Sequence, residues 1–412
     1  MIPTTSFQSN GRDYQPEARP IVVICIDGCA DEYLDAAMAR GLLPHMQRMS
    51  VEGWRGMCRG ALPAFTNVNN ASIVTGVPPA VHGICGNYFL DPDTGEEVMM
   101  NSPNFLRTGT LLAAASRAGR KVAVVTAKEK LRRILGHGLE GGIAFSSEKA
   151  AEVNAAEHGI DDVEGMLDRP APEIYSGAAS VYALEAGAVL IEQGRADFLY
   201  LSLTDYIQHK HAPDEEQALE FNAQLDQQVG RMLAAGATVG ITADHGMNAK
   251  QTDEGSPDVI FLETELEARF GPGFRVILPI TDPYVKHHGA LGSFAVVHTP
   301  DGVQQDEVSE FLRSQDGVTE VHPRDQAAKL MELPADRLGE LIVLSGRTTV
   351  LGHREEMHDL TAVQSGLRSH GGRYEEMVPL LISQPLGPRG RRMVNGDVRN
   401  FDVFDLTVNA RL

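Results

Sequence analysis

The chain has 412 residues, of which 42% are hydrophobic, and it carries a formal net charge of −20 at pH 7. A chain of this length and apolar content can bury a large core, and more than one domain is expected. The negative charge argues against nucleic acid as a partner, because the chain offers no basic field for a phosphate backbone. An anionic substrate would need concentrated local positive charge, which divalent metal ions and a few lysines can supply.

Four cysteines lie in the first quarter of the chain, in or beside apolar segments: Cys25, Cys29, Cys58 and Cys85. Their spacing does not match a zinc knuckle, and buried free thiols are expected rather than a disulfide. Residues 1–20 are polar and lack the apolar centre of a signal peptide, and no run approaches the length of a transmembrane helix. The sequence therefore predicts a cytoplasmic protein that does not enter a membrane.

Short β-branched apolar runs alternate with helix-like segments through the first 250 residues. These runs predict buried parallel strands over residues 21–26, 122–126 and 198–203, and over the stretch that ends at Asp244. Residues 66–76 are typical of a helix with Thr66 at its N-cap and Gly76 just past its end. The alternation predicts a doubly wound α/β core with a mostly parallel sheet.

From about Gln251 the pattern changes to short strand-like runs around one or two helix-like segments. This change predicts an inserted α+β cap domain over residues 251–360. The catalytic core would then consist of residues 17–250 and 361–412. The chain shows no internal repeats and no low-complexity tracts.

Carboxylates close three of the predicted strands, at Asp27, Asp205 and Asp244. In an open parallel sheet, ligands gather outside the carboxyl ends of the strands. Asp205 and His209 are four residues apart, which puts both side chains on one face of a helix, although a solvated helix face shows the same spacing. With His370 as a third ligand they can hold a metal ion and leave one coordination position open, as catalytic zinc sites do.

A second set of ligands is expected around Asp244 and His245, where Gly246 permits the irregular turn that brings adjacent residues to one ion. Asp27 would be a third ligand, and the hydroxyl oxygen of Thr66 a fourth. Metal coordination lowers the pKa of a hydroxyl group, and a helix N-terminus binds phosphoryl oxygens. Thr66 is therefore the candidate nucleophile, although taken alone it is a typical N-cap.

The order of these residues resembles the alkaline phosphatase superfamily, and most closely its nucleotide pyrophosphatase/phosphodiesterase-like branch. The stretches that carry the resemblance are IDG, FTNVNNASIVTG, HGICGN, DYIQH, ADHG and SHGG. The resemblance implies a core of the alkaline phosphatase type, two zinc ions per subunit, Thr66 as nucleophile, and Asn87 as an amide donor to a phosphoryl oxygen. One ion would be held by Asp27, Thr66, Asp244 and His245, and the other by Asp205, His209 and His370.

Within that branch, the segment VVTAKEKL resembles the phosphonoacetate hydrolases, which cleave the C–P bond of phosphonoacetate to acetate and phosphate. Lys128 and Lys130 lie in a predicted loop or helix start that follows residues 122–126. They are two residues apart, which places both on one side of an extended segment and suits the carboxylate of this small anionic substrate. Two solvated surface lysines are the alternative. His211 is expected near the same carboxylate, whereas His287 and His288 either face the cleft or pack within the cap.

The leaving group explains why two lysines matter for this reaction. Cleavage of the C–P bond expels a carbon with its electron pair, and the charge can spread onto the carboxylate as an enediolate. Two ammonium groups on that carboxylate stabilise the transition state more than the ground state, because the charge grows there.

Other functions stay open on the sequence alone. A nucleotide pyrophosphatase or phosphodiesterase with the same metal site would need an aromatic slot for a base, for which Tyr88, Phe89 and Phe105 are candidates. A phosphomutase of the superfamily would typically have serine in place of Thr66. A protein that binds metal and phosphonate without turnover would be expected to lack a ligand or the hydroxyl. Manganese or iron are alternatives to zinc, and a homodimer is one open arrangement.

Overall fold

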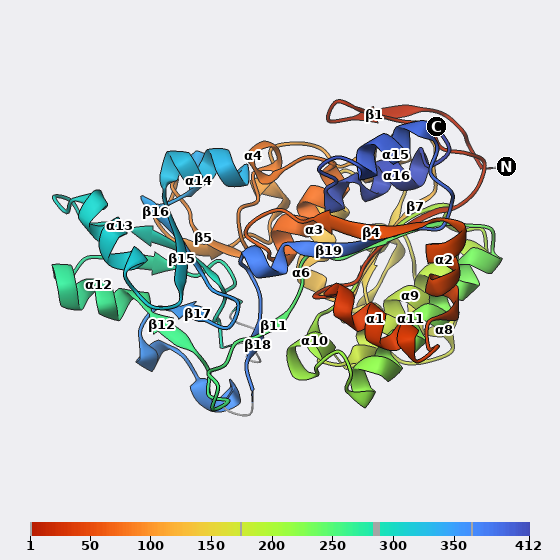
Figure 1. Ribbon diagram of the computed structural model, residues 1–412. Coiled ribbons are helices and arrows are strands. Elements are labelled where there is room, and N and C mark those ends of the chain that lie inside the picture. The colour runs from red at the N-terminus through yellow and green to blue at the C-terminus, as the bar shows by residue number, and fades with distance from the viewer. Residues whose placement is uncertain (1, 174, 283–288, 364–365) are drawn as a thin grey trace.

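A computed structural model describes residues 2–173, 175–282, 289–363 and 366–412. It shows a large α/β core with a smaller α+β region beside it (Figure 1). The core is built on a seven-stranded sheet. In spatial order its strands are β4 (Trp54–Arg59), β19 (Met377–Ile382), β10 (Thr238–Thr242), β3 (Ile21–Cys25), β9 (Phe198–Ser202), β7 (Val122–Thr126) and β8 (Ile143–Ser146).

The sheet is mostly parallel. The strand pairs from β10 across to β8 are parallel, whereas β19 runs antiparallel to both of its neighbours. The four strands predicted from apolar runs are present as β3, β7, β9 and β10, and every residue in them is buried. Burial on both faces explains why these strands show continuous apolar runs rather than alternation.

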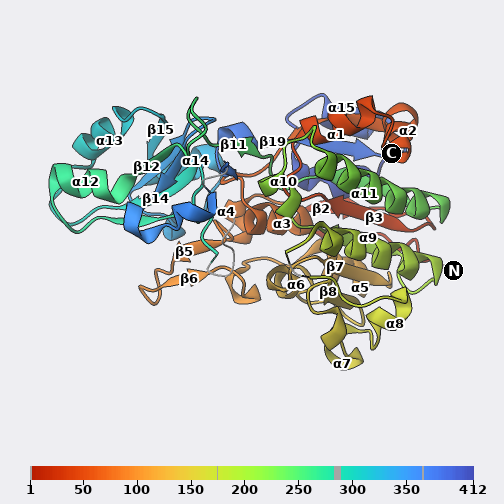
Figure 2. The ribbon, with the colours of Figure 1, turned by 90° about the horizontal axis from the view of Figure 1, so that it is seen from below.

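Helices cover both faces of the sheet, which confirms the predicted doubly wound α/β core. On one face α9 (Gly177–Glu192) and α11 (Glu216–Ala234) pack side by side, and α16 (Val403–Val408) lies on the other (Figures 1 and 2). Other core helices are α1 (Asp31–Ala39), α2 (Pro44–Glu52), α3 (Thr66–Thr75), α5 (Leu111–Arg117), α6 (Glu129–Leu135), α10 (Tyr206–Lys210) and α15 (Pro388–Val394).

The parallel strands end in register along one edge of the sheet. Cys25, the last residue of β3, is paired with Thr242 of β10 on one side and with Ser202 of β9 on the other. Ser202 is paired in turn with Thr126, the last residue of β7. Residues two or three positions beyond these four ends are therefore brought to one place, where ligands gather in parallel α/β sheets.

The described residues between 251 and 360, here called the cap region, form a second sheet of four antiparallel strands. In spatial order these are β13 (Arg275–Ile277), β14 (Phe294–His298), β16 (Leu341–Ser345) and β15 (Val318–Pro323). Its helices are α12 (Leu262–Phe270), α13 (Gln305–Arg313) and α14 (Arg324–Met331), and a short ribbon joins β12 (Val259–Phe261) to β17 (Val350–Gly352).

The chain passes between core and cap region through a two-stranded ribbon of β11 (Asn248–Ala249) and β18 (Arg368–Ser369). The hydrophobic cluster of the cap region also takes in Phe65, Ile84 and Phe89, which precede it in the sequence by more than 150 residues. The hairpin of β5 (Tyr88–Leu90) and β6 (Glu97–Met99) belongs to this contact. The cap region is thus packed directly on the segment around α3.

Two predictions about the whole chain can be compared with this fold. All four cysteines are buried free thiols, as predicted. Burial raises the pKa of Cys58 and Cys85 to about 12, so both are protonated at neutral pH. No helix in the described part of the chain has the length and apolar character needed to cross a bilayer.

Candidate active site and metal centre

Four charged residues meet at the common edge of the sheet. Asp27, Asp205 and Asp244 follow β3, β9 and β10, and all three are buried; Lys128 follows β7. The ammonium nitrogen of Lys128 lies 2.9 Å from Asp205 Oδ1 and 3.8 Å from Asp27 Oδ2. Both carboxylate oxygens of Asp27 are buried without a hydrogen-bond partner among the described residues. A buried carboxylate of this kind is costly and favours a cation at the site.

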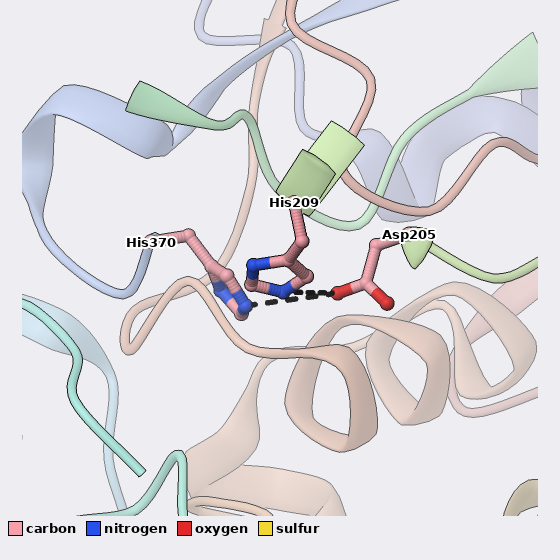
Figure 3. A group of neighbouring side chains, drawn as sticks. All are labelled: Asp205, His209 and His370. Carbon is pink, nitrogen blue, oxygen red and sulfur yellow. Dashed lines mark hydrogen bonds and ion pairs between the residues drawn. The ribbon is translucent and has the colours of Figure 1, made fainter. Parts of the chain in front are cut away.

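Asp205, His209 and His370 form one compact group (Figure 3). Asp205 is the N-cap of α10, and His209 lies one turn later with its Nε2 3.0 Å from Asp205 Oδ2. His370 follows β18, and its Nε2 lies 3.8 Å from the same oxygen. One ligand atom from each residue lies within 4.8 Å of the other two. Two imidazoles and a carboxylate at this spacing suit a divalent metal ion.

Asp27 and His245 form a second group, which shares Asp205 with the first. His245 Nε2 lies 3.3 Å from Asp27 Oδ1 and 3.8 Å from Asp244 Oδ2. The carboxylate of Asp244 accepts two backbone N–H bonds on Oδ1 and the amide of Asn70 on Oδ2. The structure therefore places Asp205 between the two groups and holds Asp244 at the edge of the second one.

All three histidines turn the same ring nitrogen toward the centre. In each of them Nδ1 lies 2.7 to 2.9 Å from a backbone carbonyl oxygen. The carbonyl groups are those of Arg368 for His209, Gly246 for His245 and Ala64 for His370. A proton held on Nδ1 leaves Nε2 as a lone-pair donor, and histidine ligands of metal ions are typically oriented in this way. The donor set and its orientation fit two divalent cations.

The buried charges perturb one another strongly. Burial raises the pKa of Asp244 to about 8, and the neighbouring Asp27 adds to the rise. Burial lowers the pKa of His245, but Asp244 and Asp27 outweigh this effect and shift it upward, so a metal ion bound at Nε2 would displace a proton. Burial and the proximity of His245 hold the pKa of His370 well below 6.5. Mutually perturbed titratable groups in one buried site are typical of a functional centre.

Thr66 is the first residue of α3, not its N-cap as predicted. Phe65 has the extended backbone of a cap, with φ −126° and ψ 155°, so the helix begins one residue earlier than expected. Gly76 ends the helix in the left-handed conformation, as predicted. The hydroxyl oxygen of Thr66 lies 3.4 Å from His245 Nε2, within the second ligand group. Every residue of α3 is buried, so this hydroxyl is held on a helix embedded in the core.

Asn87 lies beside the start of α3. Its side-chain oxygen accepts the backbone N–H of Asn67 at 3.0 Å, and its own backbone N–H donates to the carbonyl of Pro279 at 2.9 Å. Because the side-chain oxygen of Asn87 accepts a hydrogen bond from α3, its NH₂ group is the donor that it can offer to a ligand. Asn67 follows Thr66 directly, so this donor lies close to the candidate nucleophile.

Lys128 and Lys130 reach different carboxylates. Lys128 is the N-cap of α6, whereas Lys130 lies in the first turn of that helix and binds Asp282 Oδ2 at 2.7 Å. The lysines thus lie at a helix start, as one of the two predicted alternatives had it. They do not share one side of an extended segment, because α6 begins between them. Burial lowers the pKa of Lys128, but Asp205 and Asp27 outweigh this effect, and the net shift is upward. Lys128 is therefore charged at neutral pH.

The remaining predicted residues lie apart from the two ligand groups or outside the described residues. His211 follows α10, and its Nδ1 lies 2.8 Å from Glu215 Oε2. Its backbone carbonyl accepts the hydroxyl of Tyr33. These contacts direct His211 toward the start of α11. His287 and His288 lie outside the described residues.

The three aromatic residues considered for a base-binding slot belong to a packed cluster. The rings of Phe89 and Phe105 meet edge to face with centroids 5.2 Å apart. The guanidinium group of Arg337, from the cap region, lies over both rings at 5.6 and 5.7 Å. Tyr88 precedes Phe89 in β5 and is partly exposed. The two phenylalanine rings therefore pack against each other and against Arg337.

Asn70 is a residue of the site that sequence reasoning missed. Its amide nitrogen donates to the carbonyl of Thr66 and to Asp244 Oδ2. Its oxygen accepts the hydroxyl groups of Tyr200 and Ser202 on the neighbouring strand β9. The side chain therefore locks α3 against the sheet. Its position four residues after Thr66, on the same helix face, is the signal that could have identified it.

A fully buried ion pair was also missed. Lys250 Nζ lies 2.9 Å from Glu375 Oε1, and neither side chain is exposed. The other oxygen of Glu375 accepts the backbone N–H of Gly372. The pair ties the loop after His245 to the loop after His370, across 125 residues of sequence. No local pattern could have indicated it.

Comparisons with known proteins agree with this arrangement. The model of the type I phosphodiesterase / nucleotide pyrophosphatase family matches residues 21–373. Two crystal structures of phosphonoacetate hydrolase from Sinorhizobium meliloti 1021, in complex with phosphonoformate and with phosphonoacetate, are each 46% identical to this chain. Each covers 99% of this chain and 100% of its own, with a TM-score of 0.93.

Two more distant relatives complete the comparison. Human ectonucleotide pyrophosphatase/phosphodiesterase 5 shares the fold with a TM-score of 0.61 at 15% identity, over 94% of this chain and 93% of its own. An uncharacterized pyrophosphatase/phosphodiesterase of Schizosaccharomyces pombe is 32% identical over 84 residues, which are 20% of this chain and 16% of that protein. The chain therefore belongs to the type I phosphodiesterase / nucleotide pyrophosphatase family of the alkaline phosphatase superfamily, and it is a hydrolase homologous to phosphonoacetate hydrolase.

Proposed function

We propose that the protein hydrolyses phosphonoacetate to acetate and phosphate, with two zinc ions as cofactors and Thr66 as nucleophile. The observation that carries the proposal is the 46% identity, over 99% of the chain, to a phosphonoacetate hydrolase solved with phosphonoacetate. Two further features support it: the ammonium group of Lys128 lies 2.9 Å from Asp205 Oδ1, and Lys130 follows two residues later in the first turn of α6.

Two zinc ions fit the residues at this edge. The three imidazole Nε2 atoms point inward, and the buried oxygens of Asp27 have no hydrogen-bond partner among the described residues. When bound, the ions would lower the pKa of the Thr66 hydroxyl and offset the charge of the phosphonate. One ion would be held by Asp205, His209 and His370, and the other by Asp27, Asp244, His245 and the Thr66 oxygen.

Thr66 would carry the phosphoryl group. The Thr66 hydroxyl loses its proton to solvent, and attack of Oγ1 on phosphorus then forms a phosphothreonine and breaks the C–P bond, which leaves the electron pair on the departing carbon. That charge spreads onto the carboxylate as an enediolate until a proton from solvent completes acetate. Asn87 would donate its NH₂ group to a phosphonate oxygen, beside the N–H groups at the start of α3. Water then hydrolyses the phosphothreonine to phosphate and restores the hydroxyl.

Lys128 and Lys130 would hold the carboxylate of the substrate. Negative charge on that carboxylate grows as the C–P bond breaks, so two ammonium groups stabilise the transition state more than the bound substrate. Lys128 contacts Asp205 and Asp27, which are expected metal ligands. It would turn from these carboxylates to the substrate once they serve the metal ions.

Phosphate release distinguishes this function from its rivals. The zinc-loaded protein is assayed with phosphonoacetate, an aryl phosphate diester and an aryl phosphate monoester, each with and without a chelator. We expect phosphonoacetate to give the highest kcat/KM, with acetate and phosphate in equal amounts, and the chelator to abolish turnover. Preference for the diester would make the protein a phosphodiesterase. Zinc binding without turnover of any substrate would make it a binding protein.

A further inference from the structure

The geometry assigns a positioning role to Asp282, a residue of the cap region that holds the ammonium group of Lys130 at the carboxylate end of the substrate site. Through this contact Asp282 favours substrates that carry a carboxylate next to the phosphorus group. The inference rests on the proposed function, in which Lys130 binds that carboxylate.

The contact between the two side chains is short and nearly dry. Asp282 Oδ2 lies 2.7 Å from Lys130 Nζ, with the side chains 2% and 15% exposed. A charge-assisted hydrogen bond at this distance is strong where water is largely excluded. Lysine has a long flexible stem, and its ammonium group takes a defined position only where a partner holds it. Asp282 is that partner for Lys130.

The segment that carries Asp282 reaches the site at a second point. Three residues earlier, the carbonyl of Pro279 accepts the backbone N–H of Asn87 at 2.9 Å. The two segments are in close contact, since a Cβ atom on Gly86 would lie 2.7 Å from the Cβ of Pro279. The same cap segment therefore contacts Asn87, the expected phosphoryl donor, and Lys130, the expected carboxylate ligand. It spans the two ends of the proposed substrate.

Asp282 acts through Lys130, so its effect should depend on the carboxylate of the substrate. A substrate without a carboxylate does not bind Lys130. Loss of Asp282 should therefore weaken the reaction of phosphonoacetate but not that of a phosphate ester that lacks a carboxylate.

A purely structural ion pair between core and cap region is the competing explanation. The chain offers a matched control in Glu320, a cap residue whose Oε1 lies 2.9 Å from Nε of Arg373 in the core. This pair also joins core and cap region, and its side chains are 25% and 30% exposed. Neither Lys128 nor Lys130 contacts Glu320 in the described structure. Glu320→Ala therefore removes a core–cap ion pair without touching the lysines.

The experiment compares Asp282→Ala, Asp282→Asn and Glu320→Ala with the parent protein, all loaded with zinc. KM and kcat are measured with phosphonoacetate and with an aryl phosphate monoester. We expect Asp282→Ala to raise KM for phosphonoacetate on the order of tenfold and to leave kcat/KM for the aryl ester within about twofold. Asp282→Asn keeps an oxygen acceptor for the ammonium group, so it should raise KM only about threefold. Glu320→Ala should not alter kcat/KM for one substrate more than for the other.

A double variant tests whether Asp282 acts through Lys130. In a Lys130→Ala background, Asp282→Ala should add no further loss with phosphonoacetate. A further loss in that background, an equal loss on both substrates, or an unchanged KM in Asp282→Asn would overturn the assignment. Asp282→Asn keeps the side-chain volume and serves if the alanine variant does not fold. Failure of the parent protein itself to cleave phosphonoacetate would instead overturn the proposed function.

Discussion

The imidazole rings of His245 and His370 stack with their centroids 3.5 Å apart and their planes within 6° of parallel. The two rings belong to different candidate ligand groups, so the stack joins these two groups. Each ring is also held through its Nδ1 by a backbone carbonyl. The relative position of the two Nε2 atoms therefore depends on this contact.

Replacing His370 should separate its role as a ligand from its role in the stack. His370→Phe removes the ligand but keeps a ring against His245, so we expect one zinc ion per chain. His370→Ala removes both, and the affinity for the remaining ion should fall by roughly tenfold more. Metal analysis and zinc titration of the folded variants measure this. Two retained ions in His370→Phe would contradict the assignment of His370 as a ligand.

Thr66→Ala should abolish turnover of phosphonoacetate, with a loss of kcat of at least about a thousandfold, because it removes the proposed nucleophile. Thr66→Ser keeps a hydroxyl at the start of α3 and should retain measurable activity. Acid quenching followed by peptide mass spectrometry should find phosphothreonine in the parent protein. A phosphoryl group on a different residue would be incompatible with the proposed mechanism.

Replacement of both Lys128 and Lys130 by alanine should lower kcat/KM for phosphonoacetate by about a thousandfold, since two charge-assisted hydrogen bonds are lost. Some activity on an aryl phosphate monoester should remain, because this substrate has no carboxylate for them to bind. Lys149, an exposed lysine paired with Glu152, offers a control as Lys149→Ala. Equal losses on both substrates would show that the lysines serve the phosphoryl group instead.

His82 should make the protein less stable in acid. It is fully buried, its Nδ1 accepts the backbone N–H of Ile84, and its Nε2 lies 2.8 Å from the hydroxyl oxygen of Ser72. Burial lowers the pKa of His82 from 6.5 to about 3. Below pH 6.5 the unfolded chain binds a proton at this histidine that the folded chain does not bind, so the free energy of unfolding decreases as the pH is lowered. From about pH 7 to about pH 5 this costs about 2 kcal/mol.

Urea unfolding at the two pH values measures the effect. A His82→Gln variant lacks the titrating group, so its free energy of unfolding should change less between them, by about 2 kcal/mol. The test compares how much the free energy of unfolding of each protein changes between the two pH values, since the substitution itself also alters stability. An equal change in the two proteins would show that His82 is not neutral in the folded state.

The buried pair of Lys250 and Glu375 should be costly to break. Removal of one partner leaves an uncompensated charge in the core, so Glu375→Ala should lower the free energy of unfolding by about 3 to 5 kcal/mol. Burial lowers the pKa of Lys250, and neither side chain of the pair is exposed. The double variant Lys250→Met, Glu375→Gln removes both charges, so its free energy of unfolding should decrease less than that of Glu375→Ala. A larger loss in the double variant would argue against this explanation.

Several features of the site followed from local patterns, and others did not. Burial on both faces makes a strand apolar along its whole length, so β3, β7, β9 and β10 could be predicted from composition. The helix start at Thr66 was misplaced by one residue, because a polar residue near a helix start fits either the N-cap or the first turn. The prediction that Lys128 and Lys130 share one side of an extended segment was wrong for a similar reason, since the pattern did not show where α6 begins.

The sequence by itself determined the parallel strands and the charged residues that end them, because strand periodicity and strand ends are local properties of a chain. Only the tertiary structure decided that Asp205 stands between the two ligand groups, that Lys130 meets Asp282, and that Lys250 meets Glu375. The last two pairs join residues 152 and 125 positions apart. The first of these pairs forms where the cap region packs on the core, and the second where the core segments before and after the cap region meet. No local pattern carries that information.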